Sequence, residues 1–116
     1  MMILVTLLLA AAPPSGMPDL RAADARLNAQ YRATMAEMRR RDAAPQPDAT
    51  TGPSYAQALL DAQRKWIAFR DANCLSVAYE YRGGSAERLS RGTCLVSMTD
   101  ARTRELRQIQ RGASPD

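Results

Sequence analysis

Apolar residues recur every three or four positions in three stretches of this chain, and segments rich in proline or glycine separate these stretches. Such spacing places apolar side chains on one face of an α-helix, so the pattern predicts three amphipathic helices. β-branched residues are few after the first twelve positions, which argues against a sheet-based core. We therefore expect an all-α fold, a small three-helix domain whose length suits a single core.

The first helix is predicted from Asp19 to about Asp42, because Asp19 can accept a hydrogen bond from the free N–H groups of the first turn. Residues 43–53 follow and contain three prolines and a glycine, so we expect a flexible loop there. The predicted buried face of the first helix consists of Leu20, Ala23, Leu27, Tyr31, Met35 and Met38.

The second helix is predicted to begin near Ser54, since Ser54 and Gln57 have the spacing of a capping box. It should end at Gly83 and Gly84, because glycine readily adopts the left-handed conformation that ends helices. Its predicted buried face consists of Leu59, Ala62, Trp66, Phe69, Asn73 or Cys74, Val77 and Tyr81.

Residues 85–91 are predicted to form a short extra helical turn, with Leu89 pointing inward. A last helix is expected from about Thr93 to Arg111, and Gly112 should end it. The expected apolar stripe of this helix consists of Cys94 or Leu95, Met98, Ala101 or Arg102, Leu106 and Ile109.

The chain begins with an apolar run that ends in three alanines, Ala10 to Ala12. This run is far shorter than the roughly 20 residues that span a bilayer as a helix, and it matches the apolar region of a secretory signal. We expect residues 1–16 to be a signal peptide and residues 17–116 to be the exported domain, periplasmic or secreted, with no transmembrane segment in the mature chain. The competing interpretation is a buried N-terminal segment.

The two cysteines, Cys74 and Cys94, are twenty positions apart. In an oxidising compartment two such cysteines usually pair, so we expect one disulfide that staples the second helix to the third. Closing a loop of this size contributes roughly 3 kcal/mol to the stability of the fold. The alternatives are a redox-active pair, which the absence of a C-x-x-C spacing disfavours, and two separate thiols.

The chain contains no histidine, which excludes Ser-His-Asp and Cys-His catalysis. Two cysteines without histidine cannot complete a usual zinc site. We therefore expect no enzyme activity, no metal and no cofactor. The net charge is +4, but the arginines alternate with acidic residues, as on solvated helix faces. The one basic cluster, residues 39–41, is too short to indicate nucleic-acid binding.

Two neighbouring pairs of residues on the second helix each have two interpretations. Trp66 and Phe69 are three positions apart, which is typical of a core and also compatible with a binding platform. We expect the core. Arg70 and Asp71 flank the apolar stripe, and they form either a partly buried pair that fixes the helix or a solvated pair of small value. We favour partial burial.

The segment Arg82-Gly83-Gly84-Ser85 is predicted to be mainly a helix stop. It is also an exposed turn, and exposed turns are where recognition residues concentrate. It is therefore the candidate binding turn.

The order D-x-R-L-N-x-x-Y, A-Q-x-x-W-I-x-F-R-D-x-x-C, Y-x-G-G-S and C-x-x-x-x-T-x-x-R-x-x-x-L resembles the LprI-like lysozyme inhibitor family of bacterial envelope proteins. The matching positions are Asp24, Leu27, Asn28, Tyr31, Ala62, Gln63, Trp66, Ile67, Phe69, Arg70, Asp71, Cys74, Gly83, Gly84, Ser85, Cys94, Thr99, Arg102 and Leu106. The resemblance implies a small, secreted or periplasmic helical module with a disulfide, and for some members inhibition of lysozyme. Trp66, Phe69, Arg70 and Asp71 form the core of its motif.

The resulting hypothesis is an exported binding module that blocks the cleft of a peptidoglycan-cleaving lysozyme. Arg82 at the glycine turn is expected to pair with the two carboxylates that such enzymes use. The alternative is a structural envelope protein that contacts anionic polymers through its arginine-rich faces.

Overall fold

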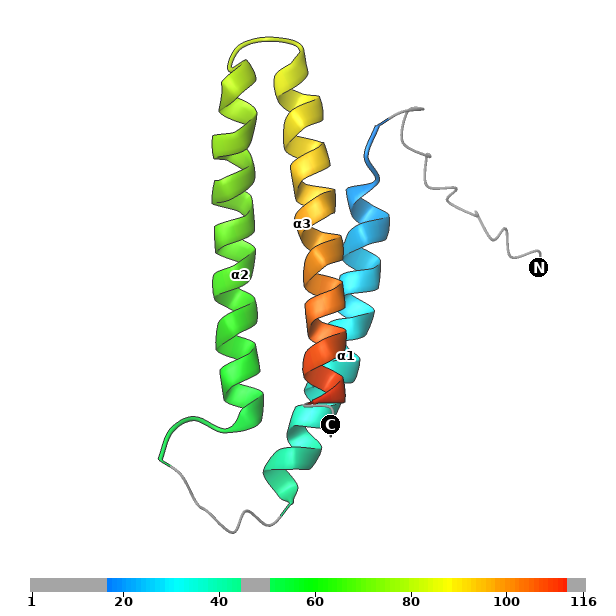
Figure 1. The fold of residues 1–116 in the computed structure, drawn as a ribbon, viewed down its shortest axis with the longest axis vertical. Helices are drawn as coiled ribbons and strands as arrows, with labels where there is room; N and C mark the ends of the chain where they lie inside the picture. The colour runs from blue at the N-terminus through cyan, green and yellow to red at the C-terminus, as the bar shows by residue number, and fades with distance from the viewer. Residues whose placement is uncertain (1–16, 45–50, 113–116) are drawn as a thin grey trace, which may run out of the picture.

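The structure, a computed structural model, describes residues 17–44 and 51–112 (Figure 1). Over those residues it consists of helices, in the order α1 (Leu20–Ala43), α2 (Tyr55–Ala78), the short 3₁₀ helix η1 (Tyr79–Tyr81) and α3 (Ala86–Arg111), and no strand. The expected all-α three-helix fold is confirmed. The expected signal peptide, residues 1–16, lies outside the described residues, as do residues 45–50 of the expected loop.

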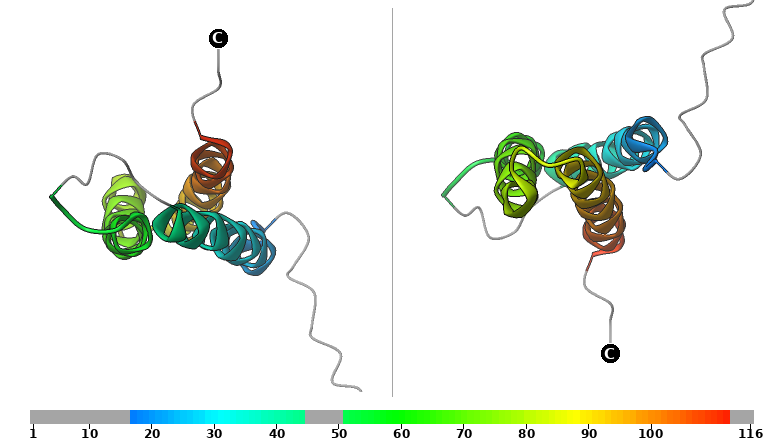
Figure 2. Two further views of the ribbon diagram at one scale, coloured as in Figure 1. Left: turned by 90° about the horizontal axis from the view of Figure 1, so that it is seen from below. Right: turned by 90° about the horizontal axis from the view of Figure 1, so that it is seen from above.

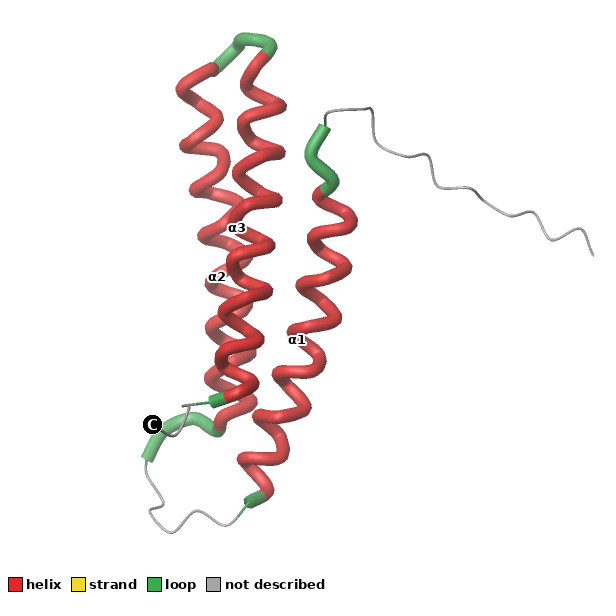
Figure 3. The backbone as a smooth tube through the Cα atoms, turned by 45° about the vertical axis from the view of Figure 1, so that its right-hand side comes forward, coloured by secondary structure: helices red, strands yellow, loops and turns green. Residues whose placement is uncertain are grey.

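Helices α2 and α3 form an antiparallel hairpin, and α1 lies beside α3 and runs in the same direction (Figure 1). The end-on views show that α1 is near α2 at its C-terminal end and moves away from it toward its N-terminal end (Figure 2). The hairpin also extends past the start of α1 (Figure 3). We call the part of the hairpin that contains its turn, from Val77 to Ser97, the hairpin end.

Side chains close the N-terminal ends of the first two helices, as the sequence predicts. The Asp19 carboxylate accepts a bond from the Ala22 N–H at 3.0 Å, and the Ser54 hydroxyl accepts one from the Gln57 N–H at 3.1 Å. A further cap comes from Asp42, whose carboxylate accepts from the N–H groups of Tyr55 and Ala56 at 2.8 and 3.0 Å. Because Asp42 belongs to the last turn of α1, this cap ties the two ends of the loop together.

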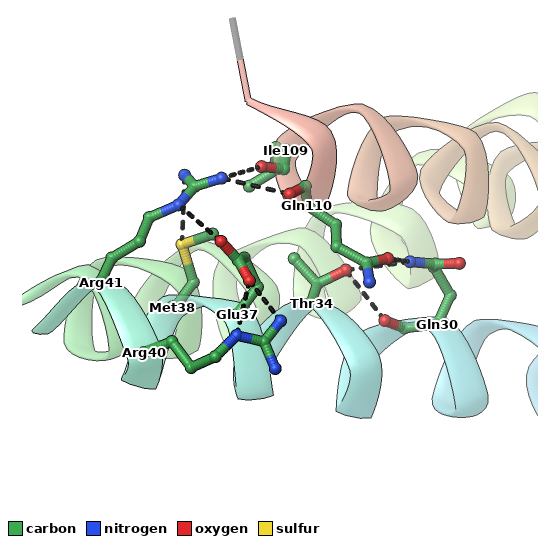
Figure 4. Close-up of polar contacts among 8 residues, drawn as sticks. All are labelled: Gln30, Thr34, Glu37, Met38, Arg40, Arg41, Ile109 and Gln110. Atoms are coloured by element: carbon green, nitrogen blue, oxygen red, sulfur yellow. Dashed lines mark hydrogen bonds and ion pairs between the residues drawn. The ribbon is translucent and has the colours of Figure 1, made fainter. Parts of the chain in front are cut away.

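Another polar contact holds the C-terminal end of α3 against α1 (Figure 4). The Arg41 guanidinium donates to the carbonyl oxygens of Ile109 and Gln110 at 3.2 and 3.1 Å. Carbonyls in the last turn of a helix lack the usual donor four residues on, and the Ile109 carbonyl otherwise accepts from the Gly112 N–H at 3.2 Å. The guanidinium from α1 adds donors there, and its charge offsets the negative end of the helix dipole. Gly112 then ends α3 with a positive φ of 75°.

Helix α2 ends at Ala78, five residues before the predicted stop at Gly83, and η1 lies between them. The chain does turn at Gly83, which has a φ of +79°. The expected separate turn at 85–91 is wrong, because α3 begins at Ala86 and runs without interruption through this segment. The extra helical turn exists, but it is η1, before the glycines. Gly92 does not break α3, and a Cβ added there would lie 3.5 Å from the Pro18 ring, so the helix passes close to that ring.

The buried face of α1 agrees with the prediction, whereas that of α2 differs from it. The residues of α2 that are buried are Leu59, Gln63, Cys74 and Ala78. Four residues that were expected inside are exposed: Ala62, Phe69, Val77 and Tyr81. Leu89 of α3, also expected inside, is exposed as well. With the half-buried Trp66 and Arg70 included, the inward positions of α2 recur every three or four residues. Polar residues occupy two of them, Gln63 and Arg70, so a hydropathy pattern selects the wrong face.

Candidate functional site

The expected disulfide joins Cys74 of α2 to Cys94 of α3, with an S–S distance of 2.15 Å and Cα atoms 5.4 Å apart. Cys74 is fully buried, and Cys94 is partly buried. Met98 packs beside the bond, with its sulfur 3.6 Å from the Cys74 sulfur. The disulfide therefore links the two helices of the hairpin close to the hairpin end.

Arg70, one of the motif residues, connects all three helices. Its Nη1 donates to the Asp24 carboxylate on α1 and to the Thr99 hydroxyl on α3, both at 3.2 Å. Its Nε donates to Asp71 at 3.0 Å, and the guanidinium lies 5.3 Å from the centre of the Trp66 ring. The Arg70 side chain is 11% exposed and that of Asp71 is 53% exposed, so the arginine of this pair is nearly buried and the aspartate is exposed.

A second buried arginine lies on α3. The Arg102 Nε donates to the Gln63 side-chain oxygen at 3.0 Å, and Nη1 donates to Glu105 at 3.0 Å. Its Nη2 is buried without a hydrogen-bond partner among the described residues. Gln63 and Arg102, with Arg70 and Thr99, belong to the motif of the family that the sequence resembles. These polar motif residues therefore hold helices together, and they do not form an exposed binding surface.

Of the aromatic motif residues, Tyr31 and Trp66 pack partly against the core. Phe69 is 60% exposed, so its predicted place in the core is wrong. The reason is geometric: Arg70, the next residue, takes the inward direction, and two adjacent residues of a helix point about 100° apart.

The candidate binding turn Arg82-Gly83-Gly84-Ser85 lies at the far end of the hairpin and is exposed. The turn is hydrogen-bonded: the Arg82 N–H donates to the Tyr79 carbonyl at 3.1 Å, and the Gly84 N–H donates to the Tyr81 carbonyl at 2.8 Å. The Gly83 N–H donates to the Glu87 carboxylate at 3.1 Å. These bonds brace the turn.

The Arg82 guanidinium lies 4.7 Å from the centre of the Tyr79 ring, a cation–π contact. Among the described residues no carboxylate is within ion-pair distance of it. The turn therefore presents a cation that no described carboxylate neutralises.

An open groove of about 610 Å³ lies beside the turn, between the end of α2 and the start of α3. Its lining residues are Val77, Tyr81, Ala86, Leu89, Ser90, Thr93, Cys94 and Ser97. None of them is charged, and the three large apolar ones are 45–48% exposed. Sequence reasoning missed this groove because it placed those three side chains in the core.

The groove opens on the side of α3 that does not face α1. Gly92 lies next to Pro18, and the Leu106 carbonyl accepts from Thr34 of α1 at 3.0 Å, so these positions mark the α1-facing side. By helical periodicity, Ser90 and Ser97 point in nearly the opposite direction. Helix α1 therefore leaves the groove uncovered.

The fold and this site define a class: a small, disulfide-linked helical module whose motif residues support the fold and whose exposed features lie at the hairpin end. Residues 17–106 match the family described as lysozyme inhibitor LprI, and the chain belongs to that family. The family is one of inhibitors.

A relative from Rhizobium meliloti (strain 1021), described as an uncharacterized protein, is 39% identical over 95 residues. The match covers 82% of this chain and 68% of the relative. No solved structure matches the chain. Within residues 17–44 and 51–112, no helix has the length and apolar character needed to cross a bilayer.

Proposed function

We propose that this chain is a periplasmic or secreted module that inhibits a peptidoglycan-cleaving lysozyme by placing its hairpin end in the enzyme's cleft. The observation that carries the proposal is the exposed Arg82 at the tip of a hairpin that extends past α1 (Figure 1). A projecting end can enter a concave cleft, whereas the rest of the molecule is a bundle of parallel and antiparallel helices. Membership of the LprI family supports the choice of a lysozyme as the partner.

Arg82 has the chemistry that a lysozyme cleft would bind. Most glycoside hydrolases have two carboxylates flanking the bond that they cleave. A guanidinium can donate two parallel hydrogen bonds to a carboxylate, and such charged pairs are stronger than neutral hydrogen bonds. The hydrogen-bonded turn and the Tyr79 ring already restrict Arg82, so less conformational entropy is lost on binding.

The uncharged groove would supply the apolar part of the contact. This chain carries a net charge of +4, and a basic lysozyme would repel it at long range. Because no charged residue lines the groove, close contact there adds no repulsion between like charges. The exposed side chains of Val77, Tyr81 and Leu89 can then lose water against the rim of the cleft.

The test is a turbidity assay in which several lysozymes clear peptidoglycan-containing cells with and without the purified chain. We expect the unaltered chain to inhibit, and we expect Arg82→Ala to weaken the affinity for the lysozyme about tenfold or more. This is the size of effect seen when a central charged residue is removed from an interface. Arg104→Ala, an exposed arginine far along α3, is the matched control and should inhibit normally. Unchanged inhibition by Arg82→Ala would contradict the proposed role of the tip, and inhibition of no lysozyme would contradict the function.

A structural role in the envelope is the second candidate, and the exposed arginines favour it. Besides Arg82, nine arginines are exposed without a carboxylate partner among the described residues: Arg21, Arg32, Arg39, Arg64, Arg88, Arg91, Arg104, Arg107 and Arg111. They suit contact with anionic polymers. The affinity for such polymers should fall steeply as salt is added, whereas the affinity of a contact that fills a cleft should change little.

A further inference from the structure

A second groove, of about 440 Å³, lies between α1 and the first turns of α2, at the opposite end of α2 from the binding turn. Its volume is in the range of pockets that hold small molecules. It shares no residue with the groove at the hairpin end. Its function would therefore be separate from lysozyme binding.

The floor of this groove is apolar and continuous with the core. Met35, which is 8% exposed, belongs to the buried cluster of the bundle, and Ala56 and Leu60 pack against that cluster. An apolar group in the groove would therefore lose water against the side of the core itself.

The rim of the groove combines donors with positive charge. Its polar side chains are Tyr31, Arg32, Arg39 and Gln57, all of which can donate hydrogen bonds, and no acidic residue lines it. Glu37 neutralises Arg40, whereas Arg32 and Arg39 have no carboxylate partner among the described residues. The two arginines are seven positions apart, two turns of the same face of α1.

The backbone of α2 is not available to a ligand here. The N–H groups of Tyr55, Ala56 and Gln57 already bond to Asp42 and Ser54. The negative charge of Asp42 lies at the positive end of the α2 dipole and offsets that partial positive charge. The side chains of the rim must therefore supply any recognition of a charged group.

We propose that this groove binds a single-chain anionic amphiphile of the fatty-acid type. Its acyl chain would lie on Met35, Ala56 and Leu60, and its carboxylate would pair with the guanidinium groups of Arg32 and Arg39. An apolar floor flanked by unpaired cations fits this class of ligand better than a neutral lipid or a free small anion. The groove is two turns long, which suits a flexible chain better than a partner helix about 10 Å wide.

The test is isothermal titration calorimetry of the folded chain with laurate below its micelle concentration, at a pH where the ligand is ionised. Dodecyl maltoside carries the same chain on a neutral head, and acetate carries the same head without the chain. We expect saturable binding of one laurate per chain and no binding of acetate. Laurate should bind about tenfold or more tighter than dodecyl maltoside, because an interaction of about 1.4 kcal/mol with the head group changes the dissociation constant tenfold.

Two variants distinguish the head group from the chain. Arg32→Gln with Arg39→Gln should weaken laurate binding about tenfold or more, and Arg104→Gln with Arg107→Gln, on the exposed side of α3, should leave it unchanged. Ala56→Trp should fill the groove and abolish binding with both arginines present. Circular dichroism verifies that each variant is folded.

Several results would overturn the proposal. Equal laurate affinity in the Arg32 and Arg39 double variant, or equal affinity for dodecyl maltoside, would show apolar association without recognition of charge. Absence of laurate binding would also overturn it. Sedimentation could also show a dimer. If laurate did not dissociate this dimer and Ala56→Trp did, the groove would be assigned to a second copy of the chain.

Discussion

At the scale of single residues, buried polar side chains decide how the three helices pack. Arg70 bonds to α1 and α3 from its position on α2, and Arg102 bonds to Gln63 across the hairpin. A buried guanidinium is costly without partners, so these residues favour one relative placement of the helices over others. The family motif can be recognised in the sequence, but its interior position cannot, because arginine and glutamine are usually exposed.

Removing only the acceptor of a buried arginine should lower the free energy of unfolding more than removing both the acceptor and the arginine. Gln63→Leu leaves the Arg102 Nε buried and unpaired, so we expect the free energy of unfolding to fall by about 1–3 kcal/mol. Adding Arg102→Met should restore most of this loss, because two apolar side chains replace the polar pair. Urea denaturation of both single variants and the double variant measures the coupling. Additive losses in the double variant would contradict a specific Gln63–Arg102 bond.

Glu37 should make stability depend on pH in the acidic range. The hydrogen bond from Arg40, followed by the charges of Arg40 and Arg41, lowers the pKa of Glu37 from its ordinary value of 4.5 (Figure 4). The carboxylate therefore stabilises the fold above pH 4.5, and this contribution is lost as the pH falls toward the lowered pKa.

The measurement is the melting temperature of the unaltered chain and of Glu37→Gln from neutral to acidic pH. The two melting temperatures should differ at neutral pH, and this difference should disappear as the pH falls below 4.5. A difference that stays constant over the whole range would show that the ionised carboxylate contributes nothing.

At the scale of the elements, local signals predicted the helix ends well and the buried faces less well. Asp19 and Ser54 cap α1 and α2 where the capping rules place them, whereas α2 ends at Ala78 and Gly83 ends the 3₁₀ helix that follows it. The cap from Asp42 could not be predicted, because it depends on how the chain returns after the loop. The predicted face of α2 is wrong because polar Gln63 occupies a buried position. The sequence does not predict an unbroken α3, because Gly92 lies within it and glycine is a poor helix former.

Two glycine-to-alanine variants should shift stability in opposite directions. Gly92→Ala lies within α3, where alanine is the better helix former and its Cβ would meet Pro18 at an ordinary contact distance of 3.5 Å, so we expect a gain of about 0.5–1 kcal/mol. Gly83→Ala places a side chain at a φ of +79°, so we expect a loss of about 1 kcal/mol or more. Chemical denaturation measures both. A loss in Gly92→Ala would show that α3 and Pro18 are closer than described.

At the scale of the whole molecule, the position of α1 leaves the hairpin end uncovered. The sequence alone indicated the turn at Arg82, because Gly-Gly stops and exposed turns have local signals. The neighbouring groove could not be predicted, since its exposure depends on where α1 begins relative to the hairpin (Figure 3). Besides the backbone of the turn, the disulfide joins α2 to α3 covalently near this end, so it should matter both for stability and for the shape of the site.

Removing the disulfide should destabilise the whole domain. Cys74→Ser with Cys94→Ser opens a loop of 20 residues, and we expect the free energy of unfolding to fall by about 3 kcal/mol. Urea denaturation of this variant, and of the unaltered chain with and without reductant, provides the measurement. A change below about 0.5 kcal/mol, the usual size of a neutral surface substitution, would mean that packing alone holds the hairpin together.

The central claim is that the hairpin end, and not the polar motif residues, contacts the lysozyme. Backbone amide NMR shifts recorded during titration with an inhibited lysozyme test it directly. We predict that the largest changes fall between Val77 and Ser97 and centre on Arg82 and the groove beside it. Changes confined to α1 or to the C-terminal half of α3, with the hairpin end unaffected, would contradict the account.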